Sequence, residues 1–287
     1  LDIDGDATTI ANTEPYWFRA YMNWRKDEVN LPGNTTTASD GWGFINPTKT
    51  FAQAFARHDG NSIRRRANVA TYSEVYHDFP YLSESARGVM SSGLFENEGY
   101  FRMKYYDFVD DVVPERFASG QTNGNTTNFP LMRYADVLLM YAEACCMSGE
   151  GTANITGLEA LQRAGLTPAP ALDMDNEEYG IKAERRFELW LDDCDRYVDL
   201  IRWGDYKDFI TDTSDKGVSE HWGNECVWLL GMKDKNVRTD DPLDVSNYEV
   251  RYDPLSVRGS WNDRLYLFPF PYAETTQNPN LNQNTGW

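Results

Sequence analysis

The clearest regular pattern of apolar positions lies just after Pro130 and has the spacing of an α-helix. Five apolar residues follow one another at intervals of four, three, one and three positions: Leu131, Ala135, Leu138, Leu139 and Ala142. This spacing places them on one face of a helix. Pro130 suits the first turn, and Gly149 and Gly151 supply a stop. The pattern therefore predicts a helix that buries this apolar face.

A second helical pattern covers residues 181–203. Its apolar positions recur at helical intervals: Ala183, Phe187, Trp190, Leu191, Cys194, Val198 and Ile201. The other side is charged, and there Glu188 and Asp192 form a repulsive pair, whereas Asp192 and Arg196 form a favourable one. Such exposed pairs contribute only about 0.3–0.5 kcal/mol each. We expect one continuous helix with an exposed charged side.

Weaker patterns predict three further helices, at about residues 14–24, 48–57 and 157–164. Residues 62–76 are weakly patterned and are expected to be extended. The intervals between these segments are rich in Gly, Pro, Asn, Thr and Ser, which is typical of loops.

Long stretches have no regular pattern, chiefly residues 81–128, 205–264 and the polar tail at 272–287. Small residues such as Ala135 and Ala142 let a neighbouring helix approach closely, as in stacked helical hairpins. No second copy of a 34-residue tetratricopeptide repeat is in register. We therefore expect irregular loops packed onto a helical platform, and loops held on a rigid scaffold are where binding residues tend to lie.

Composition and charge narrow the function. Hydrophobic residues make up 41% of the 287 residues, enough for a core, and the formal charge of −18 disfavours nucleic-acid binding. The basic run Arg64–Arg66 is interpreted as a solvated or locally paired face. No run approaches the roughly 20 apolar residues that span a bilayer. The chain opens at Leu1, as an internal fragment or a mature chain would, so a missing signal peptide says nothing about its compartment.

The four cysteines are expected to be mainly structural. Cys145 and Cys146 fall on a predicted helix and are expected to be buried free thiols. A bridge between Cys194 and Cys226 stays open as an alternative. No Cys-x-x-Cys pair occurs and the three histidines lie far apart, so we expect no metal site.

Catalytic motifs are missing from the sequence. There is no Gly-x-Ser-x-Gly, no Gly-rich phosphate loop and no His-Glu-x-x-His. Glycoside hydrolysis needs two carboxylates about 5–10 Å apart around a cleft. Among 45 acidic residues no spacing singles out such a pair. We therefore expect no catalytic residues and no cofactor.

Three stretches, taken in order, resemble the carboxy-terminal region of the SusD/RagB family. Residues 133–144 are similar to its signature helix, and residues 184–189 followed by 196–204 are similar to its second motif. Residues 269–271 and 278–287 resemble its closing tail. One departure is that residues 192–195 replace a Glu-Gly and are one residue longer, which could add a bulge to the helix.

The resemblance implies a mainly α, SusD-like fold of tetratricopeptide-type helical hairpins with long irregular loops packed on one side. Residues 1–287 would form a single carboxy-terminal domain, with the amino-terminal half of the family absent. The family resemblance further implies a lipid-anchored protein on the cell-surface face of a Bacteroidetes-type outer membrane, with the anchor in a segment outside this chain. It would capture a glycan and pass it to a SusC-like TonB-dependent transporter. The alternatives are a glycoside hydrolase and a binder of peptides or glycopeptides.

Candidate ligand-binding residues come from sugar chemistry, which needs aromatic faces for C–H groups and polar side chains for hydroxyls. Trp42 is the leading candidate because Gly41 and Gly43 leave its ring uncrowded. Five further aromatic residues are weaker candidates: Tyr16, Trp17, Trp24, Trp222 and Trp261. In the signature helix, Arg133 and Asp136 are expected to pair locally, within a charge network that joins helices and binds no ligand.

Overall fold

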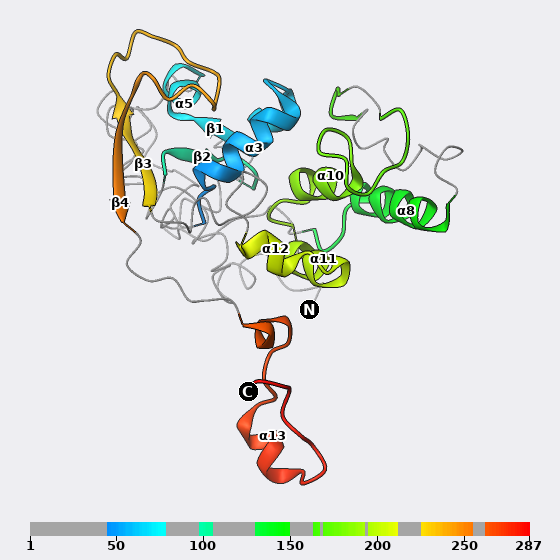
Figure 1. Ribbon diagram of the computed structural model, residues 1–287. Coiled ribbons are helices and arrows are strands. Elements are labelled where there is room, and N and C mark those ends of the chain that lie inside the picture. Colours follow the sequence, from blue (N-terminus) through cyan, green and yellow to red (C-terminus); the bar gives the residue numbers. More distant parts are fainter. Residues whose placement is uncertain are drawn as a thin grey trace, which may run out of the picture.

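The computed structural model of the chain is mainly α-helical, with two small antiparallel sheets (Figure 1). It describes residues 45–78, 98–105, 130–149, 163–166, 169–192, 195–211, 225–254 and 262–287. In order, the elements there are α3 (Lys49–Asp59), α4 (Ile63–Asn68), β1 (Val69–Thr71), α5 (Tyr72–Asp78), β2 (Tyr100–Arg102), α8 (Tyr134–Ser148), α10 (Ile181–Glu188), α11 (Asp195–Trp203), α12 (Tyr206–Thr211), β3 (Glu225–Met232), β4 (Tyr248–Pro254), the 3-10 helix η4 (Asp263–Tyr266) and α13 (Tyr272–Gln277). The predicted mainly α class is confirmed.

One core cluster lies where α3, α5 and the two sheets meet, and α10 reaches it from the other side (Figure 1). Phe187 of α10 stacks on Phe55 of α3, with ring centroids 4.9 Å apart. Phe51 and Trp190 lie 4.8 Å apart by the same measure. These rings join α10 to α3. The other large buried side chains of the cluster are Val69, Tyr72, Val75, Tyr100, Phe101, Met103, Leu229 and Tyr248.

A second core cluster joins α8, α10 and the turn between residues 169 and 180. Its buried members are Leu139, Ala142, Cys145, Ala169, Leu172, Ile181 and Leu189. Cys145 is buried and Cys146 is half-buried, and both are free thiols, as predicted for this helix. The side chains of Cys194 and Cys226 lie outside the described residues.

Helix α3 confirms the prediction for residues 48–57. The Thr48 hydroxyl accepts a hydrogen bond from the backbone N–H of Phe51 at 3.1 Å, which caps the first turn. Gly60 follows the last turn with φ 59°, a conformation that favours glycine. The candidate helices at 14–24 and, for most of its length, at 157–164 lie outside the described residues.

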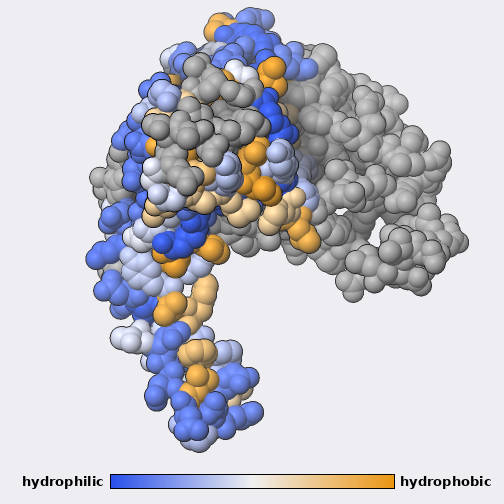
Figure 2. All heavy atoms as spheres, turned by 90° about the vertical axis from the view of Figure 1, so that its right-hand side faces the viewer, coloured by the Kyte–Doolittle hydropathy of each residue, from blue (hydrophilic) through white to orange (hydrophobic). Residues whose placement is uncertain are grey.

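Helix α8 confirms the predicted helix and its stop, but it starts later than Pro130. The predicted apolar face is buried except for Leu131, which precedes the helix and is 79% exposed. Gly149 ends α8 in the left-handed conformation. The helix also exposes a second set of large apolar side chains: Tyr134, Val137, Met140, Tyr141 and Met147. Figure 2 looks onto the side of the molecule where α8 lies in Figure 1, and apolar patches interrupt the hydrophilic surface there.

The prediction of one helix over residues 181–203 is wrong, because α10 ends at Glu188 and α11 begins at Asp195. Leu191 between them has φ 64°, which no α-helix accommodates. Two cations from other segments bind the end of α10: the Glu188 carbonyl accepts from Arg133 Nη2 at 2.6 Å and from Lys104 Nζ at 3.0 Å. They satisfy a terminal carbonyl that a longer helix would bond internally.

Two further predictions of irregular or extended structure are wrong. Residues 62–76 form α4, β1 and most of α5, and the Ser62 hydroxyl caps α4 by accepting from the Arg65 N–H at 3.0 Å. Within 205–264, β3 and β4 form an antiparallel pair, with a bulge between Leu229 and Gly231. Such short apolar runs do not distinguish a buried strand from other structure. The tail also contains a short helix, α13.

The C-terminal segment, orange to red in Figure 1, extends from the rest of the described chain. The Trp287 indole N–H closes it by donating to the carbonyls of Arg264 at 3.1 Å and Leu267 at 2.9 Å. Phe268 lies 6.0 Å from Tyr197 of α11 between ring centroids, which connects the segment to the helices. In the described parts of the chain, no helix has the length and apolar character to cross a membrane.

The basic run Arg64–Arg66 is locally paired, as predicted, but two of its three members are buried rather than solvated. Arg65 is fully buried and donates to both carboxylate oxygens of Glu74, at 2.6 and 2.7 Å. Arg64 binds Asp59 twice at 2.7 Å and also Glu184 of α10. Buried charges require such partners. The run therefore holds α3, α5 and α10 together.

The signature-helix charges form a network between helices, as predicted, but not through the expected Arg133–Asp136 pair. Arg133 donates instead to Glu188 at 2.8 Å and to Asp192 at 2.6 Å. Asp136 accepts from Arg185 of α10 at 2.8 Å. The predicted repulsion of Glu188 and Asp192 is therefore offset by a shared cation, and the charged side of residues 181–203 packs against α8 instead of water.

Acid is expected to destabilise this network. Burial by itself would raise the pKa of the Asp59 and Asp192 carboxyls, but Arg64 beside the first and Lys104 and Arg133 beside the second lower both pKa values. The unfolded chain therefore takes up protons first, and the stabilisation present above about pH 4 is lost as the pH falls below it. Glu184, whose pKa burial raises, acts in the opposite direction.

This pH dependence is measurable as the urea midpoint of unfolding at about pH 7, 5 and 3.5. We expect the midpoint to fall between the last two. A variant with Asp192→Asn should show a flatter dependence over the same interval, since one of the shifted carboxyls is gone. A midpoint that rises on acidification would contradict the proposed linkage.

Candidate functional site

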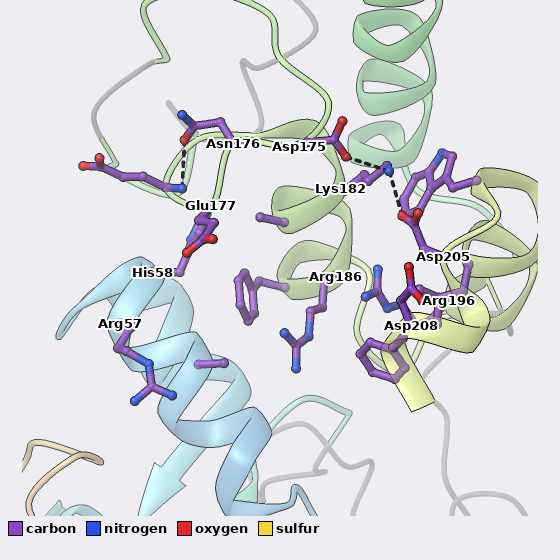
Figure 3. A pocket seen from close by; sticks show the side chains of 17 residues that line it. Arg57, His58, Asp175, Asn176, Glu177, Lys182, Arg186, Arg196, Asp205 and Asp208 are labelled. Atoms are coloured by element: carbon purple, nitrogen blue, oxygen red, sulfur yellow. Dashed lines mark hydrogen bonds and ion pairs between the residues drawn. The ribbon is translucent and has the colours of Figure 1, made fainter. Parts of the chain in front are cut away.

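A pocket of about 630 Å³ opens where α3, α10, α11, α12 and the turn at residues 175–178 meet (Figure 3). Sites for small ligands usually measure about 300–1,000 Å³. The pocket is built from segments far apart in the sequence, because the aromatic contact of α10 with α3 brings these helices together. Its size and position make it the candidate site of the described chain.

The turn that forms one edge of the pocket is shaped by side-chain hydrogen bonds to its own backbone. The Asp173 carboxylate accepts from the N–H groups of Asp175 at 2.8 Å and Asn176 at 3.1 Å. The Asn176 side-chain oxygen accepts from Glu178 at 2.9 Å and Tyr179 at 3.0 Å. Asp and Asn commonly stabilise turns in this way. The turn leads directly into α10 and places its acidic residues on the pocket rim.

Three aromatic side chains supply apolar surface to the pocket: Phe187 of α10, Trp203 of α11 and Phe209 of α12. The Lys182 ammonium lies 5.4 Å from the centroid of the Trp203 ring. Aromatic faces beside hydrogen-bonding groups suit ligands that are apolar on one side and polar on the other. Sugars have this character.

Two of the acidic residues that line the pocket share one internal cation. Lys182 pairs with Asp175 and with Asp205, at 2.7 Å in each case, and both contacts are drawn in Figure 3. Burial alone would lower the pKa of Lys182, but these two carboxylates outweigh it and raise that pKa. The Lys182 ammonium group is therefore bound by both carboxylates, and each carboxylate is bound by Lys182.

Two guanidinium groups of the pocket lie beside one ring, and in Figure 3 one of them, Arg196, lies next to Asp205 and Asp208. The central guanidinium carbons of Arg196 and Arg186 lie 5.0 and 5.7 Å from the centroid of Phe209. In Arg196, Nε and Nη1 are shielded from solvent and have no hydrogen-bond partner among the described residues. Burial lowers the pKa of Arg196 to about 10, against the attraction of Asp199 and Asp205.

His58 adds a second polar atom on the α3 side of the pocket. Its Nδ1 lies 2.6 Å from Asp59, and its ring packs against Phe187 with centroids 4.7 Å apart. The Nε2 atom is buried and, within the described chain, has no hydrogen-bond partner. With Nδ1–H donating to Asp59, Nε2 is available as an acceptor.

The six aromatic residues predicted from the sequence to bind sugar all lie outside the described residues: Trp42, Tyr16, Trp17, Trp24, Trp222 and Trp261. They stay predictions. The sequence analysis placed Lys182, Phe187 and Trp203 on a predicted scaffold helix but Phe209 in a stretch without regular pattern, so no pattern grouped the pocket residues. The sequence offered no signal for Arg196, which falls on the predicted charged side of residues 181–203. No group of three His, Cys, Asp or Glu in the described part could hold a metal ion.

Comparison with solved structures shows which known fold the chain resembles. A crystal structure of a SusD-like protein from Bacteroides fragilis aligns with a TM-score of 0.53 and 21% identity, covering 88% of this chain and 49% of that one. Surface glycan-binding protein A from Bacteroides uniformis aligns with a TM-score of 0.49 and 18% identity, covering 94% of this chain and 47% of that one. The chain thus spans about half the length of these structures. The first alignment confirms the predicted SusD-like fold.

Sequence comparison identifies the family. No curated protein is significantly similar to the chain. The model of the SusD family matches residues 10–287. Since that match covers nearly the whole sequence, including the signature helix and the closing tail, the chain belongs to the SusD family.

Proposed function

We propose that this chain is a non-catalytic glycan-binding protein of the bacterial outer-membrane surface. It captures an oligosaccharide or polysaccharide and passes it unaltered to a SusC-like TonB-dependent transporter. It is lipid-anchored through a segment outside this chain, and residues 1–287 act as one domain. The observation that carries the proposal is the match to the SusD family over residues 10–287.

The geometry of the pocket supports a glycan as ligand. Aromatic rings lie beside guanidinium, imidazole and carboxylate groups around a space of about 630 Å³. A pyranose offers a C–H face to rings and a rim of hydroxyls to donors and acceptors. Trp42, between two glycines, is proposed as a further sugar contact from the preceding loop.

A hydrolytic function is the weaker alternative. A general acid of a glycosidase needs a carboxyl with a raised pKa facing a cleft. Burial raises the pKa of Glu184, but that side chain is fully buried and bound by Arg64. It therefore cannot protonate a glycosidic oxygen in the pocket.

The test is a panel of neutral and acidic oligosaccharides, titrated by calorimetry and then assayed for new reducing ends. We expect saturable binding to at least one glycan and no product. Trp42→Ala should weaken binding about tenfold, or ~1.4 kcal/mol. Tyr272→Ala removes an aromatic side chain that is 83% exposed on the tail, and it should bind like the parent chain.

The outcomes separate the alternatives. Release of reducing ends would establish a hydrolase and refute the non-catalytic role. Absence of binding across the panel would refute glycan capture by this chain. Unchanged affinity in Trp42→Ala would refute that residue as a contact and leave the function standing.

A further inference from the structure

We propose that the pocket between α3, α10, α11 and α12 binds the acidic group of an acidic glycan, a carboxylate or a sulfate ester, and that Arg196 is the residue that pairs with it. This inference rests on the proposed glycan-binding function and narrows its ligand class. It depends on the buried guanidinium group of Arg196, because the acidic residues near it bind other cations.

Two acidic residues, Asp199 and Asp205, attract the charge of Arg196, but both bind other cations. Asp199, one turn along α11, accepts from Arg185 Nε at 2.7 Å and from Arg202 Nε at 2.9 Å. Asp205 is paired with Lys182 at 2.7 Å. Arg196 Nε and Nη1 remain buried without a partner among the described residues. The protein therefore surrounds this guanidinium with acids that do not bind it.

A buried cation without a hydrogen-bonded counter-ion is unfavourable for the folded state. The effect is visible in Arg196 itself, because burial lowers its pKa to about 10. Such a residue on a pocket wall is typical of a binding site, where a local rule of stability is broken in favour of a ligand. An anion held side-on by Arg196 would satisfy the orphaned Nε donor.

The surroundings fit a planar or tetrahedral oxyanion carried on a sugar. Nε and Nη2 of a guanidinium form one of its two-donor edges, which matches the spacing of carboxylate or sulfate oxygens. In Arg196 the Nε donor of this edge has no partner among the described residues. Arg186 presents a second guanidinium beside the same Phe209 ring. Across the pocket, His58 Nε2 is an acceptor for a hydroxyl. Phe187 and Trp203 supply faces for the C–H groups.

Long-range attraction does not favour an anion, since the chain has a formal charge of −18. Recognition must therefore come from short-range pairing in the pocket, which salt screens only weakly. This excludes a polyanion that binds by charge density alone and favours a glycan with a single acidic group per subsite.

The experiment compares acidic oligosaccharides with their neutralised forms by calorimetry. One arm uses oligogalacturonate and its methyl ester, and the other a sulfated galactan oligomer and its desulfated form. We expect at least one acidic probe to bind at least tenfold more tightly than its neutralised form. The arm that binds identifies the acid as carboxylate or sulfate.

The variant Arg196→Met keeps an unbranched side chain beside Phe209 and removes the guanidinium group with its charge. It should lose at least tenfold in affinity for the acidic probe and change less than twofold for a neutral one. Arg238→Gln is the matched control, since Arg238 pairs with Asp78 and Asp240 at the surface away from the pocket. Arg196→Met should also melt at the same temperature as the parent chain or above it.

Each contrary result is decisive. Neutral probes that bind while acidic ones do not would overturn the acidic ligand and leave the proposed function standing. If no glycan in either arm binds, both the acidic ligand and the proposed glycan-binding function would be overturned. Undiminished binding by Arg196→Met, or a clearly lower melting temperature, would show that Arg196 serves the fold and would overturn its role.

Discussion

Replacing Arg185 with alanine is expected to destabilise the chain by about 3–5 kcal/mol, the cost of breaking a buried ion pair by removing one partner. Arg185 lies on α10 and donates to Asp136 of α8 at 2.8 Å and to Asp199 of α11 at 2.7 Å. All three side chains are buried. The substitution would leave two carboxylates without this cation and remove the link between three helices.

Urea denaturation at neutral pH measures this effect. Arg66→Ala is the matched control, because Arg66 pairs with Asp78 at 2.6 Å at an exposed position, where pairs contribute about 0–1 kcal/mol. Adding Asp136→Asn and Asp199→Asn to Arg185→Ala should recover part of the loss, since the stranded charges disappear. A loss as small as that of Arg66→Ala would contradict the structural role of Arg185.

Gly99→Ala is expected to destabilise the chain by more than about 2 kcal/mol. Gly99 precedes β2 with φ 91°, a conformation that L side chains rarely adopt. A Cβ there would collide with the Leu229 side chain and would lie 2.9 Å from the Leu229 carbonyl oxygen and from Tyr72 Cε2. Both neighbours belong to the first core cluster, so neither can move freely.

Gly60→Ala separates backbone strain from collision. Gly60 also has a positive φ, of 59°, but nothing lies within 4 Å of the position that its Cβ would occupy. Gly60→Ala should lower the free energy of unfolding by about 1 kcal/mol, which is the preference of this backbone conformation for glycine alone. Thermal melts of the two variants measure the difference. Equal losses would show that the contact with Leu229 and Tyr72 does not constrain Gly99.

Local features of the fold were predictable from the sequence because their causes are local. Thr48 and Gly60 bound α3, and Gly149 ends α8, through hydrogen bonds and dihedral angles within a few residues. The buried face of α8 followed from its periodicity. The break at Leu191 did not, because the cations that bind the end of α10, Arg133 and Lys104, come from distant positions.

In the candidate pocket, too, the decisive contacts join residues that are distant in the sequence. Arg196, Phe209 and His58 stand on separate helices, and no spacing in the sequence relates them. The sequence analysis put Arg196 on an exposed charged side, Phe209 in a stretch without regular pattern and His58 just beyond a predicted helix. What distinguishes Arg196 is that its neighbours Asp199 and Asp205 bind other cations. That fact depends on which helices touch.

The sequence by itself determined the helical class, the glycine stop of α8 and the family, since each rests on local periodicity or on motifs read in order. It also determined that the charges of the signature helix serve the scaffold. Only the tertiary structure decided which residues pair with the charges of the signature helix. It also decided where α10 ends and where the pocket beside Arg196 lies. Ion pairs and cavities join residues that are remote in the chain, and their energies depend on burial, which no local pattern encodes.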